Sequence, residues 1–577
     1  MNRNRSPRSR LVWQFGCDQG IKMNRNRSRS EESVGFDPEE LGLINHIKSE
    51  LQTLREEGRL TEEDEIENLV FEGGGVKGIA YIGALQVLQE LGILTDANGN
   101  RRIKRIAGAS AGAMLASLLA IGLKLEDIDY LLNQNIKGIL EVVNQILSSL
   151  DHALGCCSLL PNLITKFGWN PGRRIERWFR QRFKELNIDS DITFAQLLER
   201  NDTELCIVST NLNRLSADYL HAKTTPNMEI YKAVRMSMSL PFYFARMRYP
   251  REDYDESDIS EKSCKCIRCW CCCCICGGWE KGSSRKDIYV DGGLVCNYPI
   301  HVFDGWWLSL EEKNHFVKKL RPFHTRIDEL YDDAARFGTE CNWKTLGLLL
   351  YSANEAEIFA KKLIEREASL FHRCKENNPS MPKQSVRNWV NYHLSKEFQT
   401  KLSQKKGRQE LDKYAVTDGN RPSYYRLEDV QEILRNLDNT AKSKLLRRGG
   451  EVDFMKKINP NNDNRVELNE ILGYFRSVGV NLRTGHLGFE RVNITKPSEY
   501  VSSLLDTLAM SSKRRFVKGV DVHRTIGINT HHVGTTNWYM DEADKKLLKK
   551  SGRRGTIAFF INEYLPRLRD RRKVTTV

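Results

Sequence analysis

A serine set between small residues is the first group in this chain that could act as a nucleophile. Ser110 lies in the segment Gly108-Ala109-Ser110-Ala111-Gly112. Glycines at these two positions suit a strand-to-helix turn so tight that Cβ atoms there would clash, and such a turn exposes the hydroxyl at a sheet edge. A strand pattern at residues 103–107 precedes it and an apolar helix pattern at residues 113–120 follows. The pattern predicts Ser110 as a nucleophile, with the helix N-terminus and the amide of Ala111 helping to hold an oxyanion.

A second glycine-rich segment follows a buried-strand pattern and opens a helix pattern that runs from residue 81 to 91. Such a loop can also bind the pyrophosphate of a nucleotide. The nucleotide interpretation lacks its ribose partner, because no acidic residue ends a following strand about 20 residues on. An oxyanion hole made of backbone amides fits better, and its predicted members are Gly73, Gly74, Gly75, Val76, Lys77 and Gly78.

A third motif ends a short β-rich run at residues 288–291 with Asp291, Gly292 and Gly293. Alone, an Asp-Gly-Gly sequence is more often only a turn. If the Asp291 carboxylate is hydrogen-bonded to Ser110, however, it can accept the serine proton directly, and no histidine is needed. The motifs together therefore predict a serine hydrolase in which Asp291 is the base.

In this order the glycine loop, the serine elbow and the Asp-Gly-Gly motif resemble the patatin-like phospholipase family. Shorter likenesses extend the resemblance to residues 206–211, 233–242, 297–300, 524–530 and 541–552. The resemblance implies an α/β fold with a mixed central sheet flanked by helices. It also implies a Ser110-Asp291 dyad that hydrolyses glycerophospholipid or lysophospholipid esters through an acyl-enzyme, with no cofactor required for the chemistry.

The resemblance also divides the chain into parts. It covers roughly residues 67–305, the first part of the catalytic domain, and returns after an inserted, mostly helical module predicted at residues 306–484. Residues 485–577 are expected to close the catalytic domain and to form a basic C-terminus. Residues 1–40 are expected to be a disordered basic tail, because they are rich in Arg, Ser and Asn and repeat one short segment.

Within the predicted insertion, residues 459–470 have the spacing of a calcium-binding EF-hand loop, with helix patterns at residues 451–458 and 466–475 on either side. The first position is a neutral Asn, and Asn464 stands where Gly normally makes the sharp turn. A helix-loop-helix that packs without metal is the favoured interpretation, and bound calcium is the alternative. The candidate ligands are Asn459, Asn461, Asp463, Glu467 and Glu470.

Composition points to peripheral contact with a phospholipid membrane surface. The 577 residues carry a net charge of +14, with basic groups concentrated at both ends. Each Lys or Arg near an anionic leaflet contributes about 1 kcal/mol of attraction, although such runs are often only solvated surface. No apolar run reaches the roughly 18 residues needed to span a bilayer, and no secretory signal peptide is expected. We expect a cytoplasmic, membrane-associated protein with no specific nucleic-acid partner, and the sequence implies no oligomeric state.

Eight of the fifteen cysteines lie in residues 264–276, near Trp270 and Trp279. Disulfides are not expected, because adjacent cysteines rarely meet the required geometry. Zinc is one alternative, since Cys266 and Cys269 have a finger-like spacing but lack a second well-spaced pair. An unmodified reduced loop is another. The favoured interpretation is an S-acylated loop that anchors the protein to a membrane.

Two other functions compete with the dyad hydrolase. One is an α/β-hydrolase with a Ser-Asp-His triad completed by a late histidine: His523, His531 or His532. It is disfavoured because Glu72 precedes the glycine run, where the lipases with that triad usually carry His. The other is a catalytically silent, membrane-associated lipid-binding scaffold that uses the basic ends and the cysteine loop. The intact serine, aspartate and glycine motifs count against it.

Overall fold

The computed structural model describes residues 35–132 except 97, 168–250 except 171, 286–320, 333–351, 359–371, 497–570 except 532 and 536–539, and short stretches between 416 and 470. The cysteine-rich residues 264–276 and the first 34 residues lie outside the described part. Among the calcium candidates, Asn459 and Glu470 are described, whereas Asn461, Asp463 and Glu467 are not.

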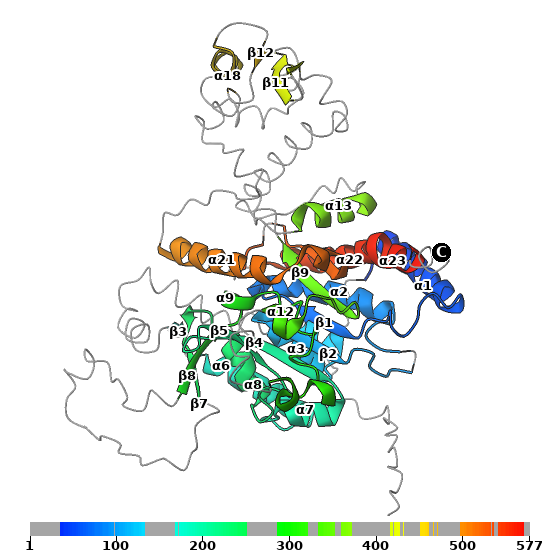
Figure 1. The fold of residues 1–577 in the computed structure, drawn as a ribbon, viewed down its shortest axis with the longest axis vertical. Helices are drawn as coiled ribbons and strands as arrows, with labels where there is room; N and C mark the ends of the chain where they lie inside the picture. Colours follow the sequence, from blue (N-terminus) through cyan, green and yellow to red (C-terminus); the bar gives the residue numbers. More distant parts are fainter. Residues whose placement is uncertain are drawn as a thin grey trace, which may run out of the picture.

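A mixed eight-stranded sheet forms the centre of the molecule (Figure 1). Five neighbouring strands are parallel, in the order β13 (Thr525–Asn529), β9 (Thr345–Tyr351), β1 (Asn68–Phe71), β2 (Arg105–Ala109) and β4 (Glu204–Asn211). Three strands joined by antiparallel pairs complete the sheet: β8 (Lys286–Asp291) and β5 (Ser216–Leu220) pair with β4, and β7 (Met247–Pro250) pairs with β8. Every residue of β1, β9 and β13 is buried, as expected for parallel strands covered on both faces.

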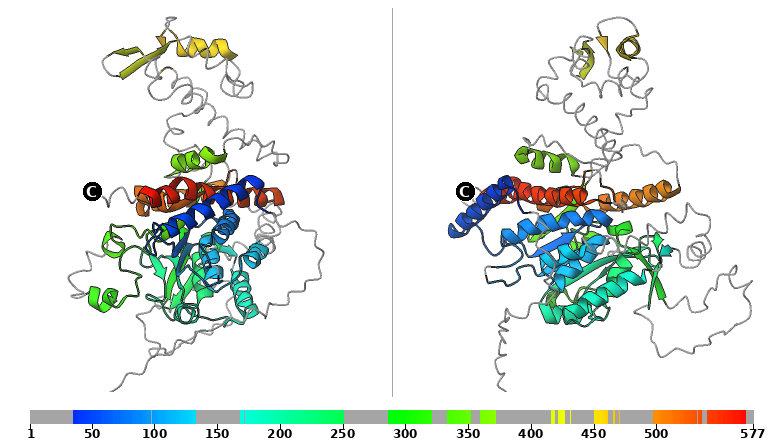
Figure 2. Two further views of the ribbon diagram at one scale, coloured as in Figure 1. Left: turned by 90° about the vertical axis from the view of Figure 1, so that its right-hand side faces the viewer. Right: turned by 180° about the vertical axis from the view of Figure 1, so that it is seen from behind.

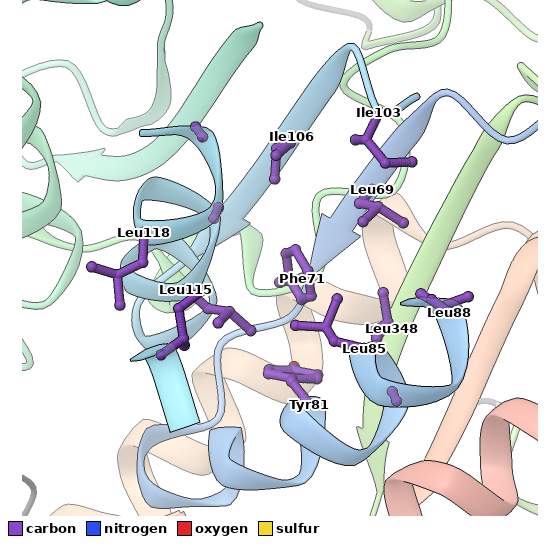
Figure 3. Packing of buried hydrophobic residues seen from close by; sticks show 14 of the residues in the cluster. Leu69, Phe71, Tyr81, Leu85, Leu88, Ile103, Ile106, Leu115, Leu118 and Leu348 are labelled. Atoms are coloured by element: carbon purple, nitrogen blue, oxygen red, sulfur yellow. The ribbon is translucent and has the colours of Figure 1, made fainter. Parts of the chain in front are cut away.

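Alternate residues of the parallel strands pack into two separate apolar layers. Leu69 and Phe71 of β1 face α2 (Ala80–Glu90) and α3 (Ala111–Ala120), where they meet Tyr81, Leu85 and Leu115 (Figure 3). Val70, between them, belongs to the cluster on the opposite face. This alternation follows from the period of two along a strand, and it fixes the register that brings the carboxyl ends of β1 and β2 together.

Helices from distant parts of the chain cover the sheet (Figures 1 and 2). α22 (Glu542–Phe559) lies against α2 at very short range, because a Cβ on Gly83 would lie 1.8 Å from the Lys549 carbonyl oxygen and one on Gly552 would lie 2.0 Å from that of Ala80. α1 (Pro38–Glu56) contacts α22, and its capping box joins Asp37 to Glu40. α7 (Phe194–Asn201) and α8 (Ile230–Ser237) contact β4, and α6 (Arg173–Glu185) packs against α8.

The α/β class and the mixed sheet flanked by helices are as predicted, but the predicted start of the insertion at residue 306 is wrong. β9 lies inside the predicted range, yet it pairs with both β1 and β13 in the central sheet. α13 (Ala360–Phe371) also packs against α22 and β13. The sequence signal is ambiguous here, because a short continuous apolar run such as Leu346–Leu350 fits a buried strand and a buried helix equally well.

A small three-stranded sheet lies farther along the chain. It contains β10 (Val416–Asp418), β11 (Arg421–Arg426) and β12 (Arg465–Val466). α18 (Gly450–Ile458) occupies the range of the helix predicted at residues 451–458. The helix predicted to begin at residue 466 is wrong at its start, because Val466 is in a strand and pairs with Tyr425.

Candidate active site

Two strands meet end to end along one edge of β4 and bring the candidate nucleophile and base together. β5 occupies one edge of β4 from Ile207 to Asn211, so β2 and β8 must both pair with the other edge. Parallel β2 pairs with β4 as far as Val208, and antiparallel β8 pairs from Ser209 onward. Ser110, one residue beyond β2, therefore faces Asp291, the last residue of β8.

The two side chains are in direct contact. Ser110 Oγ donates a hydrogen bond of 2.7 Å to Asp291 Oδ2, and the other carboxylate oxygen accepts the Gly293 N–H at 2.8 Å. Ser110 has φ 51° and ψ −123°, which is unusual for a residue with a Cβ. Its N–H donates to Ser237 Oγ at 2.8 Å, and that hydroxyl donates to the Val208 carbonyl oxygen at 2.6 Å. These bonds hold the elbow in its strained conformation.

The glycines of the elbow are required by close backbone contacts, as the sequence predicts. A Cβ on Gly112 would lie 2.6 Å from the Phe71 carbonyl oxygen, and one on Gly108 would lie 2.4 Å from the Gly112 carbonyl carbon. A Cβ on Gly292 would lie 2.1 Å from the Val208 carbonyl oxygen. The turn at Ser110 can therefore approach β1, and the turn after Asp291 can approach β4, only because the glycines at these positions have no Cβ.

Burial controls the charge of Asp291. The side chain is 3% exposed. Burial raises the pKa of Asp291 from 3.8 to about 7, while the hydrogen bonds from Ser110 and Gly293 act in the opposite direction. A carboxyl group with a pKa near neutrality suits a general base that must take up and return a proton at physiological pH.

The glycine loop lies beside Ser110. A Cβ on Gly73 would lie 3.0 Å from Ser110 Cβ and 2.3 Å from Asn297 Oδ1, and Gly75 has φ 54°. Several of the predicted oxyanion amides already have acceptors. The Gly73 N–H donates to the Asn297 carbonyl oxygen at 3.0 Å. The Lys77 N–H donates to the Gly74 carbonyl oxygen at 3.1 Å, and the Val76 N–H donates to the Thr535 carbonyl oxygen at 3.4 Å. Gly78 lies within the helical turn η1 (Gly75–Ile79) that follows. The amides of Gly74, Gly75 and Ala111 remain as candidates.

A buried ion pair beneath the loop was not anticipated from the sequence. Glu72 and Lys513 are 2% and 3% exposed, and Glu72 Oε1 lies 2.5 Å from Lys513 Nζ. Asn297 Nδ2 donates to the same oxygen at 3.0 Å and to the Gly73 carbonyl oxygen at 2.9 Å, while the Leu350 N–H donates to Glu72 Oε2 at 2.7 Å. The carboxylate thus ties the glycine loop to β9 and to α21 (Pro497–Phe516). The sequence feature that could have indicated this ion pair is Glu72 itself, an acidic residue directly after a buried strand.

The late histidines have partners away from the dyad. His523 Nδ1 lies 2.7 Å from Glu563 Oε2, and His531 Nε2 lies 2.9 Å from Ser551 Oγ. His532 is outside the described residues. Both oxygens of Asp291 are instead engaged by Ser110 and Gly293. Within the described ranges, no three His, Cys, Asp or Glu side chains are placed to share a metal ion, and no helix has the length and apolarity needed to cross a membrane.

Comparison with known proteins finds a family model and several relatives that match the part of the chain containing this site. Residues 69–304 match the model of the patatin-like phospholipases. R571, an uncharacterized protein of Acanthamoeba polyphaga mimivirus, is 29% identical over 285 residues, which are 48% of this chain and 77% of that protein. YqhO, an uncharacterized protein of Bacillus subtilis strain 168, is 28% identical over 254 residues, or 43% and 68% of the two chains.

A third relative carries a functional name. The probable lipid hydrolase 463L of Invertebrate iridescent virus 6 is 23% identical over 234 residues, which are 41% of this chain and 62% of that protein. The matched range of the family model runs from β1 through the serine elbow to the residues after Asp291, so it contains all three sequence motifs. Through residues 69–304, the chain is similar to the patatin-like phospholipases.

Proposed function

We propose that this protein is a lipid acyl hydrolase of the phospholipase A or lysophospholipase type, acting through Ser110 and Asp291. The observation that carries the proposal is the 2.7 Å hydrogen bond between a strained serine hydroxyl and a buried carboxylate at the edge of the sheet. Similarity to the patatin-like phospholipases over residues 69–304 supports lipid hydrolysis and chemistry that needs no cofactor.

In the proposed first step, Ser110 Oγ attacks the carbonyl carbon of the lipid ester and its proton passes to Asp291 Oδ2. The tetrahedral oxyanion is held by the amides of Gly74, Gly75 and Ala111. Collapse breaks the bond to the alcohol part of the lipid, which leaves with the proton from Asp291. A fatty acyl group then remains on Ser110.

In the second step, water attacks the acyl-enzyme and gives a proton to Asp291. The second tetrahedral intermediate collapses, the proton returns to Ser110 Oγ and the fatty acid leaves. Only the ionised form of Asp291 can start either step. With a pKa of about 7, it is ionised in roughly half of the molecules at neutral pH.

The proposed site of action is the cytoplasmic face of a membrane, to which the protein binds peripherally. Support comes from the basic ends of the chain and from the cysteine-rich residues 264–276, which we propose to be S-acylated. The described chain leaves the sheet at Pro250 and returns at Lys286, and these two residues pair with each other across β7 and β8.

The deciding experiment is a hydrolysis profile of the purified protein on mixed phospholipids and lysophospholipids, with and without calcium. We expect release of fatty acid by the wild type and none by Ser110→Ala or Asp291→Asn. Hydrolysis that persists in either variant refutes the dyad, and failure of the wild type on every lipid favours a silent lipid-binding scaffold. Dependence on calcium would favour a functional EF-hand loop at residues 459–470.

A further inference from the structure

The hairpin between β4 and β5 ends in an exposed apolar tip. Leu212 is 46% exposed and Leu215 is 87% exposed. Leu215 also has φ 55°, in the left-handed region that Gly or Asn occupies far more readily. Among the described residues other than glycine with positive φ, only Leu215 and Phe242 are apolar, and both are exposed. Two exposed apolar residues with strained backbones do not help the fold, which indicates a surface that binds a partner.

The hairpin tip and Phe242 each follow closely on a residue that pairs with or binds Asp291. Leu212 is three residues beyond Ser209, the partner of Asp291 in the sheet, so the tip extends roughly 10 Å past the dyad at about 3.3 Å per residue. Phe242 is three residues beyond Ser239, whose carbonyl oxygen accepts the Asp291 N–H at 3.0 Å. The exposed apolar groups thus lie at the edge of the sheet where the nucleophile is presented.

Basic side chains surround the tip. Arg214 is at its centre, and the Leu212 N–H donates to the carbonyl oxygen of Ile288, which pairs with exposed Arg248. Lys286, at the start of β8, is exposed as well. The neighbouring acid, Asp287, is 6% exposed; its Oδ2 accepts a hydrogen bond from Asn211 Nδ2 at 3.0 Å and lies 3.4 Å from Arg214 Nε, so Arg214 is ion-paired whereas Arg248 and Lys286 add further positive charge. An apolar tip within a basic border is complementary to the acyl boundary and the anionic head groups of a phospholipid leaflet.

We propose that Leu212 and Leu215, bordered by Arg214, Arg248 and Lys286, form the surface by which the protein docks on an anionic phospholipid bilayer. This inference rests on the proposed function, because docking there would hold the Ser110 elbow next to lipid esters. It is independent of the cysteine-rich residues and of the basic ends of the chain.

The test uses the full-length protein, phosphatidylcholine vesicles with and without phosphatidylserine, and a water-soluble short-chain ester. Asn suits the conformation of residue 215, so Leu215→Asn is expected to fold at least as well as the wild type. Leu41→Asn is the matched control, because Leu41 is 45% exposed but lies on α1, at the end of the molecule away from β7 and β8 (Figures 1 and 2).

We expect the vesicle-binding constant to fall on the order of tenfold for each leucine replaced, in Leu212→Asn and Leu215→Asn. The Lys286→Gln variant should lose about fivefold, and only on vesicles that contain phosphatidylserine. Turnover of the soluble ester should stay within about twofold of the wild type, and Leu41→Asn should behave like the wild type in every assay.

Unchanged vesicle binding in both leucine variants, or equal loss in Leu41→Asn, overturns the proposal. So does a change from dimer to monomer in Leu215→Asn with vesicle binding intact, because the tip would then be a protein interface. If the protein hydrolyses no ester at all, the proposed function fails, while the binding measurements still decide the docking surface.

Discussion

Replacing Asp291 by Asn should abolish hydrolysis and, at the same time, make the folded protein more stable at alkaline pH. Burial holds the pKa of Asp291 at about 7, above its ordinary value of 3.8. The folded state therefore binds this proton more tightly than the unfolded state does. Any stability linked to the carboxyl group is fully present below pH 4 and is lost as the pH rises through 7.

The magnitude follows from the two pKa values. At pH 8 the ionised, buried carboxylate costs roughly 4 kcal/mol of folding free energy relative to a neutral side chain, and at pH 5, where the buried carboxyl group must take up a proton on folding, the cost is roughly 1–2 kcal/mol. Asn can still accept the Ser110 hydrogen bond, but its amide group cannot accept the Gly293 N–H as well, which costs about 1 kcal/mol. Asp291→Asn should therefore be more stable than the wild type by roughly 3 kcal/mol at pH 8 and by less than about 1 kcal/mol at pH 5.

Urea unfolding of both proteins at pH 5 and pH 8, followed by tryptophan fluorescence, measures this difference. Ser110→Ala is the matched inactive control. It removes the hydroxyl that stabilises the carboxylate and should lower the free energy of unfolding at pH 8 by about 1–2 kcal/mol. If Asp291→Asn is less stable than the wild type at pH 8, or if the gap is the same at both pH values, the reasoning about the buried base is wrong.

Four further predictions follow from the site. The kcat/KM of the wild type on a soluble ester should rise about tenfold from pH 6 to a plateau above pH 8, with a midpoint near 7; a flat profile would exclude Asp291 as the titrating base. Alanine at His523, His531 or His532 should leave ester turnover within about tenfold of the wild type, and loss as complete as in Ser110→Ala would restore the triad. Glu72→Ala should cost about 3–5 kcal/mol in urea unfolding because Lys513 stays buried, and Glu72→Met with Lys513→Met should recover part of it; equal stability of the single variant and the wild type would contradict a buried pair. Serine at every cysteine in residues 264–276 should move the protein to the soluble fraction of cells and remove its hydroxylamine-sensitive acyl groups, whereas stoichiometric zinc in the purified protein would favour a metal site.

The parts of the site that could be predicted are those in which local backbone geometry restricts residue choice. The elbow at Ser110 has room only for small residues beside the serine, so the glycines in the sequence were enough to predict the turn. The same is true of the turn after Asp291. The contact between the two residues depends on β2 and β8 sharing one edge of β4, and strand order cannot be derived from either segment alone.

Other features depend on partners far along the chain. The strand Thr345–Tyr351 lies inside the range predicted as a helical insertion. Its apolar run carries no period, and only its pairing with β1 and β13 identifies it as part of the central sheet. Glu72 is explained by Lys513, which lies beyond the predicted insertion. No pattern in the sequence distinguishes Leu215 from other residues near a turn. Its exposure and its positive φ are known only from the folded hairpin.

The central claim is that Ser110 is a nucleophile activated by Asp291. Reaction with a fluorophosphonate, followed by peptide mass spectrometry, tests it most directly. We predict one adduct per chain, located on Ser110, absent in Ser110→Ala and formed far more slowly in Asp291→Asn. An adduct on another residue would show that Ser110 is not the nucleophile, and labelling of Asp291→Asn at the wild-type rate would show that Asp291 does not activate it.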